Sequence, residues 1–531
     1  MYDKRSFKKI IPLAAFGLSI LFVSSFCLAA GPKYGGTLRI GVRVPQFTRL
    51  DARALTTETM VPSATMIYDY LYGFSDKGLR ELVPALATKI ETHDNKVWLI
   101  HLRRGVKFHN GREMTAQDVK ANFDWRIQTP KGWKPVRYKE LIKYLKKAEV
   151  LDKYTVKVTL EKPFAPLIRV LAYSMRGIIP PEEAEKWKDK FTFHPCGTGP
   201  FKVVEIKPKE RVVLGRFEDY WGPRPYVDKV VYKFYRSNEA RLVALQKGEL
   251  DIAPLFDEAK PVLDRDPNLS YHEVVNPTVL HKFYFNMRRW PMNDIRFRKA
   301  VWMGADWRNI AVNSFPFQSG NFARTFLDYT KYFNPDAVGL VPSYNPQEAK
   351  KLIEAVEKDA GKKIPPIYWL DSSWAPGKAT AEVAKVQLAQ IGVPLNLQLL
   401  SHAIWFDKIL RDPKIEWDMA GYGAGFGVAA CLGFRYFETD SATAPDGKSL
   451  GGYASPEFDK WILRSEAALN EPDRLSCYYE AEKVLIRDAA AIPLFIFRML
   501  IAYNKSVKGL VATDTGNIYV TNTWTNVWLN R

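Results

Sequence analysis

The chain has 531 residues, of which 47% are hydrophobic and 25% charged, and its formal net charge is +19. This length excludes a domain with a single core, and the four cysteines exclude a scaffold built on disulfides, so two or more lobes are expected. Because basic and acidic residues are interspersed, the charge predicts a solvated surface or an acidic small-molecule partner rather than nucleic acid.

The first 30 residues predict a secretory signal peptide. Basic residues open the segment, residues 10–23 form an almost unbroken apolar run, and small residues close it at Ala29 and Ala30. A retained transmembrane anchor is the alternative, because the apolar run approaches the length that spans a bilayer. Cys27 would suggest a lipoprotein, but Phe26 places a bulky ring where the lipoprotein signal needs a small residue. We expect export to the periplasm of a Gram-negative bacterium and removal of residues 1–30.

A glycine turn that feeds a strand is predicted at residues 33–42, KYGGTLRIGV. The loop at residues 45–51 follows the carboxyl end of this strand, which is where open α/β sheets bind ligands. Gln46 and Phe47 in this loop are therefore candidate ligand-binding residues.

A strand, a turn and a helix are predicted between residues 86 and 127. The strand is indicated by the alternation of Trp98, Ile100 and Leu102 with polar residues, and the turn by Asn110-Gly111. Thr115 and Asp118 have the spacing of a capping box, and apolar residues follow at helical spacing.

A strand–helix–strand unit is predicted in the second half of the chain. Residues 365–371 form a short apolar strand, residues 381–391 a helix that Gly392 ends, and residues 395–399 an alternating strand. Parallel strands with crossover helices predict an α/β sheet covered on both faces. Further along, a long helix is predicted at residues 471–490 and a return strand at residues 492–496.

Four stretches resemble the bacterial extracellular solute-binding proteins of family 5, which are peptide, nickel and oligosaccharide receptors of ABC importers. They are residues 84–119, with LRRGVKFHNGREMTAQDV; residues 197–201, GTGPF; residues 211–235, with DYWG; and residues 285–300, FNMRRWPMNDIRFRKA. The resemblance extends over nearly all of residues 33–528.

The resemblance implies the type II periplasmic-binding-protein fold, with two α/β lobes, a hinge and an inserted extra domain (cluster C type). Lobe I would comprise residues 31–72, 196–277 and 501–531, the inserted domain II residues 73–195, and lobe III residues 278–500. We expect the lobes to close by bending near residues 276–282 and 497–504. The implied partners are a small-molecule solute and the membrane permease of an ABC importer, with the receptor acting as a monomer.

The motifs that would indicate an enzyme are weak in this sequence. Ser449 lies in a GxSxG pattern, but its loop is polar and rich in turn residues, whereas a nucleophile elbow lies between a strand and a helix. The chain has no HxxxH pair and no CxxC, so no metal site is expected, and neither a cofactor nor a catalytic residue is predicted. His109 is expected to be a hydrogen-bonded structural residue. A secreted hydrolase that uses Ser449 remains the alternative from another class of protein.

The stretch WDMAGYGAGFGVAACLGFRYF, residues 417–437, departs from the peptide-binding members of the family. The resemblance implies a tryptophan and then an aspartate that pairs with the peptide α-amino group, but residues 419–436 contain no acidic residue. Glycines at 421, 423, 425 and 427 predict an open floor. We therefore expect a non-peptide, modified or carboxylated solute, with a conventional di- or oligopeptide receptor as the alternative. The predicted ligand-binding residues are Gln46, Phe47, Trp374, Tyr422, Phe426, Arg435 and Tyr436.

Overall fold

The computed structural model describes residues 31–43, 50–53, 61–75, 78–128, 144–175, 177–314, 321–373, 375–423, 425–427, 429–441, 443–511 and 523–531. The chain divides into two compact units, Met1–Pro32 and Lys33–Arg531, and the second carries all the elements below. The predicted signal peptide and three of the predicted ligand-binding residues, Gln46, Phe47 and Trp374, lie outside the described residues.

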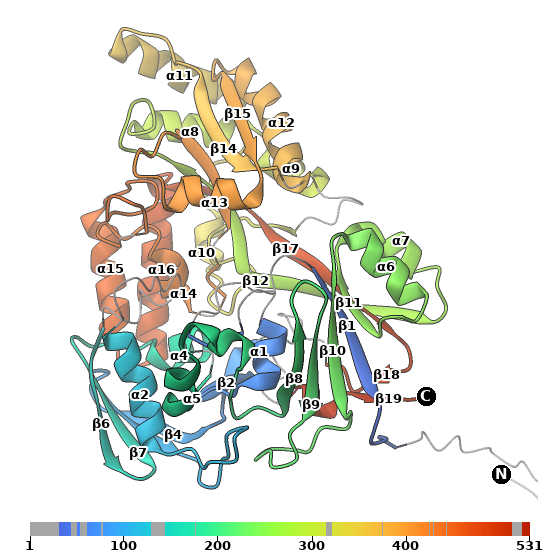
Figure 1. Cartoon of the computed structure of the whole chain (residues 1–531). Coiled ribbons are helices and arrows are strands. Elements are labelled where there is room, and N and C mark those ends of the chain that lie inside the picture. Colours follow the sequence, from blue (N-terminus) through green and yellow to red (C-terminus); the bar gives the residue numbers. More distant parts are fainter. Residues whose placement is uncertain are drawn as a thin grey trace, which may run out of the picture. The chain divides into compact units, whose positions relative to one another are not determined.

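The main sheet is mixed and has eleven strands, in the order β15-β14-β16-β12-β17-β11-β1-β10-β9-β8, with β13 paired to β17 (Figure 1). The strands are β1 (Thr37–Arg43), β8 (Phe201–Lys207), β9 (Arg211–Arg216), β10 (Lys229–Tyr235), β11 (Ile252–Leu255), β12 (Leu269–Phe285), β13 (Asn321–Phe322), β14 (Ile367–Ser372), β15 (Leu395–Leu400), β16 (Met419–Gly423) and β17 (Ala491–Asn504). The parallel pairs are β1 with β10 and β11, and β14 with β15 and β16. The predicted α/β class is confirmed.

Two long strands, β12 and β17, join the two halves of this sheet. They pair antiparallel with each other, while β12 also pairs with β16 and β17 also pairs with β11. The β12–β17 register shifts between Asn276 and Leu280 and again between His281 and Lys282. An irregular ladder bends more easily than a regular one, and this irregularity lies within the stretch at which the sequence predicts a hinge. Hinge bending itself stays a prediction.

A second sheet has four strands in the order β4-β5-β7-β6. Its strands are β4 (Ala87–Thr92), β5 (Val97–Leu102), β6 (Leu145–Asp152) and β7 (Thr155–Leu160). In β5 the residues Trp98, Ile100 and Leu102 are buried, as their alternation predicts. The remaining strands form two small pairs, β2 (Tyr72–Ser75) with β3 (Gly78–Pro84) and β18 (Val507–Lys508) with β19 (Trp528–Leu529).

Helices follow most of the strands. They are α1 (Val61–Ile67), α2 (Ala116–Ile127), α4 (Leu167–Ser174), α5 (Pro181–Trp187), α6 (Asn238–Gln246), α7 (Lys260–Leu263), α8 (Ile295–Gly304), α9 (Trp307–Asn313), α10 (Pro335–Val338), α11 (Pro346–Ala360), α12 (Ala375–Gln390), α13 (His402–Leu410), α14 (Ala430–Phe434), α15 (Pro456–Ala467) and α16 (Glu471–Arg487). Helix α2 begins after Thr115, whose backbone N–H donates to the Asp118 carboxylate at 2.8 Å, so the predicted capping box is present.

The predicted strand–helix–strand unit is formed by β14, α12 and β15, with β14 and β15 parallel. Helix α12 begins at Ala375, before the predicted start at residue 381. The prediction began too late because APGKAT, in the first turns of the helix, contains the proline and glycine that usually indicate a loop. Gly392 follows the helix with a φ of +88°. Strand β17 continues to Asn504, well beyond the predicted end at residue 496.

Buried apolar residues form two large cores. One contains residues such as Leu38, Phe74 and Phe108 from the first part of the chain, and the other lies entirely between Leu280 and Ile496. The second core falls within the predicted lobe III, whereas the first is continuous over the predicted lobe I and inserted domain. The domain boundaries stay a prediction. Cys196, Cys431 and Cys477 are buried free thiols.

Candidate functional site

Strands β12 and β16 place a set of aromatic and basic side chains on one face of the main sheet. Lys282 is opposite Tyr422 in the antiparallel register, and Tyr284 is opposite Ala420. Directly opposed residues share a face of a sheet, so Lys282, Tyr284 and Tyr422 lie together. With three residues from the segment after β16 they form the aromatic–basic cluster: Lys282, Tyr284, Tyr422, Phe426, Arg435 and Tyr436.

One end of the aromatic–basic cluster is a hydrogen-bonded group of two phenols and a guanidinium. The hydroxyls of Tyr422 and Tyr436 are 3.5 Å apart, and Arg435 Nη2 donates to the Tyr436 hydroxyl at 2.9 Å. The Arg435 guanidinium also lies 4.7 Å from the centroid of the Tyr436 ring. Arg435 is at the C-terminal end of α14, so this short helix fixes the position of the charge beside the two phenols.

The other end of the cluster is a fully buried lysine. The Lys282 ammonium lies 5.1 Å from the Phe426 ring centroid and 5.8 Å from the Tyr284 ring centroid, and it donates to the Leu280 carbonyl at 3.1 Å. Lys282 has no exposed surface, and this burial lowers its pKa well below the usual value. Lysines are rarely buried, so such a residue points to a functional role.

Sequence reasoning missed Lys282 and Tyr284. The available signal was the alternation in LHKFYFN, where Leu280, Lys282 and Tyr284 fall on one face of a strand whose other residues are mostly apolar. A lysine inside such a run indicates either an edge position or a buried charge. The pairing with β16, which shows which of these applies, is a long-range contact that the sequence does not reveal.

The opposite face of the same strands carries a buried His–Asp pair. His281 Nε2 lies 3.5 Å from Asp371 Oδ2, and the His281 ring stacks on Phe495 at 4.8 Å. Asp371 also accepts a hydrogen bond from the Ser372 backbone N–H at 2.7 Å. Residues 419–436 include no acidic residue, but β14 brings the Asp371 carboxylate beside Gly421 of β16.

The expectation of an open floor is wrong at Gly421. A Cβ atom added to Gly421 would lie 2.1 Å from Asp371 Oδ2 and 2.8 Å from His281 Nε2. The glycine is needed because the His281–Asp371 pair occupies the adjacent space, a close approach that only a residue without a side chain allows. This glycine makes room for protein side chains rather than for a solute.

The structure brings together four of the seven predicted ligand-binding residues. Tyr422 and Tyr436 are nearly buried and in ring contact at 5.5 Å, with Arg435 partly exposed next to them. Phe426 is fully buried and packs against Phe434, with the ring centroids 5.0 Å apart. Ligand binding by these residues stays a prediction.

Ser449 has a structural environment. Its hydroxyl is buried and donates to the Tyr453 carbonyl at 2.7 Å, within the segment that connects α14 to α15. No strand precedes it among the described residues of this segment, so it lacks the setting of a nucleophile elbow.

His109 is a half-buried hydrogen-bonding residue. Its Nε2 lies 3.0 Å from the Gly199 carbonyl, and the Gly197 N–H donates to its Nδ1 at 3.4 Å. Burial lowers the pKa of His109 to about 4, so the ring is neutral at physiological pH. His109 thus connects the signature region to the GTGPF stretch.

Within the part of the chain that the structure describes, no group of three or more His, Cys, Asp or Glu side chains is arranged to hold a metal ion. None of the described helices combines the length and apolar character needed to cross a bilayer.

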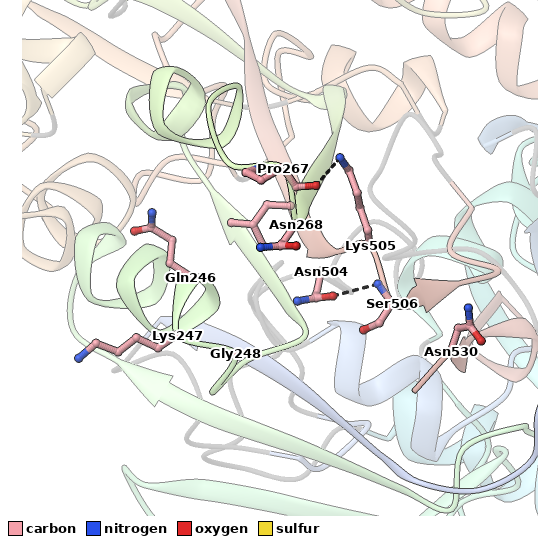
Figure 2. A pocket seen from close by; sticks show the side chains of 10 residues that line it. Gln246, Lys247, Gly248, Pro267, Asn268, Asn504, Lys505, Ser506 and Asn530 are labelled. Atoms are coloured by element: carbon pink, nitrogen blue, oxygen red, sulfur yellow. Dashed lines mark hydrogen bonds between the residues drawn. The ribbon is translucent and has the colours of Figure 1, made fainter.

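A polar depression of about 460 Å³ is lined by none of the residues of the aromatic–basic cluster. The end of α6, the start of β12, the end of β17 and Asn530 line it (Figure 2). Two of its side chains are bonded to neighbouring backbone, since Lys505 Nζ donates to the Pro267 carbonyl at 2.6 Å and Asn504 Oδ1 accepts from the Ser506 N–H at 2.9 Å. The depression has no buried charged side chain and is a weaker candidate than the cluster.

The architecture is that of the type II periplasmic binding proteins, as comparison with solved structures shows. The chain is similar to the periplasmic binding protein DppA from Helicobacter pylori in complex with the peptide STSA, with a TM-score of 0.80 and 22% identity over 94% of this chain and 99% of that one. It is also similar to AgaA from A. tumefacien R10 in complex with agropinic acid, with a TM-score of 0.77 and 22% identity over 93% and 99% of the two chains.

Comparison of the amino-acid sequence with known families shows which family the chain belongs to. The model for bacterial extracellular solute-binding proteins, family 5 (middle region), matches residues 81–437, and the chain belongs to this family. Among curated relatives, the glutathione-binding protein GsiB of Salmonella choleraesuis (strain SC-B67) is 25% identical over 524 residues, covering 95% of this chain and 96% of the relative. The chain is therefore a solute-binding protein, and these relatives are named as binding proteins.

Proposed function

We propose that this protein is a periplasmic receptor that binds a carboxylated solute between its lobes and delivers it to the permease of an ABC importer. Residues 1–30 direct export and are removed, and the mature receptor acts as a monomer without catalysis. Membership in family 5 supports the receptor class. The relatives bind ligands as different as a peptide and agropinic acid, so the ligand class has to be argued from this chain's own residues.

The observation that carries the ligand class is the pair of basic side chains in the aromatic–basic cluster. Lys282 lies between two aromatic rings with no exposed surface, and Arg435 provides a second basic group beside Tyr436. A carboxylate is the complementary solute group, since arginine can hold it with two hydrogen bonds and a protonated lysine with one.

The hydroxyl of Tyr284 gives independent support. It is buried and has no hydrogen-bond partner among the residues that the structure describes. Burial of an unpartnered hydroxyl is unfavourable, and such groups in native proteins usually have a role or a missing partner. A solute oxygen that accepted this hydrogen bond would remove the penalty.

Calorimetry on the protein without residues 1–30 tests the proposal, with glutathione, agropinic acid and the peptide STSA as probes. We expect a carboxylated non-peptide or modified solute to bind, and Arg435→Gln to weaken binding about tenfold or more through loss of a charged hydrogen bond. Arg487→Gln is a control of equal charge change, because Arg487 pairs with Glu457 on the surface. Micromolar binding of a di- or tripeptide that is lost on N-terminal acetylation would contradict the proposal.

A conventional peptide receptor is the second candidate, and Asp371 is the observation that favours it. Its carboxylate lies next to β16, where the peptide-binding members of the family carry an acidic residue. However, Asp371 already lies within ion-pair distance of His281 and is fully buried on the face opposite Lys282. A peptide α-amino group would have to displace His281, so we rank this candidate second.

Ser449→Ala is expected to have the same rate of ester hydrolysis as the wild type. The substitution removes one buried hydrogen bond to the Tyr453 carbonyl, so it should lower the free energy of unfolding by only about 1 kcal/mol. Wild type and variant would be compared on an activated ester and by urea unfolding. A hydrolytic activity well above background that Ser449→Ala abolished would favour the hydrolase alternative.

A further inference from the structure

We infer that Glu466, at the end of α15, is a latch that holds the four-stranded sheet against the C-terminal helices when the receptor is closed. This device goes beyond the proposed function, although its use rests on closure of the lobes. The latch consists of Glu466 with its hydrogen-bond partners Tyr144 and Lys162, together with two backbone contacts described below.

The two carboxylate oxygens of Glu466 contact two different residues that flank strands of the four-stranded sheet. The Tyr144 hydroxyl donates to Oε1, and Lys162 Nζ lies 3.1 Å from Oε2. Tyr144 immediately precedes β6, and Lys162 follows β7. The Glu466 side chain is only 4% exposed, so its charge depends on these partners.

Two hydrogen bonds to backbone carbonyls extend the contact. The Ala165 N–H donates to the Glu466 carbonyl at 2.7 Å, and Asn95 Nδ2 donates to the Ala468 carbonyl at 3.1 Å. Asn95 lies between β4 and β5, so this connection takes part as well as the residues that flank β6 and β7. Residues about 300 or more apart in sequence are thereby joined at one place.

The surroundings of Tyr144 make it a directional donor. Its ring stacks on Phe164 with centroids 4.1 Å apart, which fixes the direction of the hydroxyl. Burial, and then the charges of Glu466 and Glu438, raise its pKa, so the phenol keeps its proton and Glu466 accepts it in a hydrogen bond. Cys431 and Leu432 of α14 belong to the same apolar core as Tyr144, so the contact also has an apolar part.

The charges on the two sides are complementary beyond Glu466. Arg169 of α4 acts electrostatically on Glu471 at the start of α16, adding to the larger effect of Lys331, and together they lower the pKa of Glu471. The side that includes the four-stranded sheet thus presents Lys162 and Arg169, and the C-terminal helices present Glu466 and Glu471. These contacts form only while the two sides are together, so they contribute to the free-energy difference between the open and closed states.

Hydrogen exchange of the Ala165 amide tests the latch without a ligand, because this N–H is bonded across the contact. In Glu466→Gln we expect the Ala165 amide to exchange about tenfold faster, as expected for loss of one or two charged hydrogen bonds. The Leu160 amide, which donates to Lys96 within the sheet, should be unchanged. X-ray scattering should show a larger radius of gyration for Glu466→Gln than for the wild type.

Glu457→Gln is the matched control, since it removes the same charge from α15. The Glu457 carboxylate pairs with Arg487 of α16 at 2.7 Å and not with the four-stranded sheet. Tyr144→Phe should reproduce the effect of Glu466→Gln, and the two substitutions together should add little. Equal Ala165 exchange in the wild type, Glu466→Gln and Glu457→Gln would overturn the inference. Failure of every probe ligand to bind would contradict the proposed ligand class but would leave this result unaffected.

Discussion

Gly421→Ala is expected to lower the free energy of unfolding by about 3 kcal/mol. A Cβ atom at this position would lie 2.1 Å from the Asp371 carboxylate, and Asp371 is fully buried. The carboxylate cannot turn to solvent, so the substitution must displace either the His281–Asp371 pair or strand β16. Urea unfolding of the two proteins measures the difference.

Gly339→Ala is the control for this substitution. Gly339 follows α10 with a φ of −68°, and a Cβ atom there would meet nothing within 4 Å. We expect its free energy of unfolding to stay within about 0.5 kcal/mol of the wild type. If Gly421→Ala were as stable as Gly339→Ala, the close approach of Asp371 to β16 would be wrong.

Local sequence signals predicted the elements whose cause is local. The capping box at Thr115 and Asp118, the alternation in β5 and the β14–α12–β15 unit are each determined by residues close together in the chain. The start of α12 was missed because a proline and a glycine in its first turns outweighed the periodicity that follows.

The candidate site was predicted only in part, because half of it depends on strand register. The segment after β16 could be read as a cluster of aromatic residues with one arginine. Its partners on β12, Lys282 and Tyr284, come from a strand about 140 residues earlier, and only the antiparallel register places them on the same face. The parallel register of β14 with β16 likewise explains why Asp371 occupies the space beside Gly421.

The position of the cluster connects ligand binding to movement. Lys282 is at the second register shift of the β12–β17 ladder, and Tyr422 is its cross-strand neighbour. A solute held by Lys282 would therefore contact the strand that is expected to bend. Glu466 acts at a separate contact. Solute binding and the Glu466 contacts would therefore contribute separately to the free-energy difference between the open and closed states.

Lys282→Met is expected to raise the free energy of unfolding by about 1–3 kcal/mol at neutral pH while weakening binding of a carboxylated solute. Burial of the amine is unfavourable, and methionine fills a similar volume without a charge. Stability and affinity should therefore change in opposite directions. If Lys282 were a structural residue, its replacement would instead lower the free energy of unfolding.

The pH dependence of unfolding separates Lys282 from other lysines. Its pKa in the folded protein lies well below its value in the unfolded chain, about 10.4. Between these two values the unfolded chain binds a proton that the folded protein does not, so the free energy of unfolding rises with pH in this window. Lys282→Met should remove this rise, whereas Lys229→Met, at an exposed position of β10, should keep it. Urea unfolding from pH 7 to about pH 10 measures the slope; an identical slope in both variants, with solute affinity unchanged in Lys282→Met, would show that Lys282 is neither a buried titrating group nor part of the binding site.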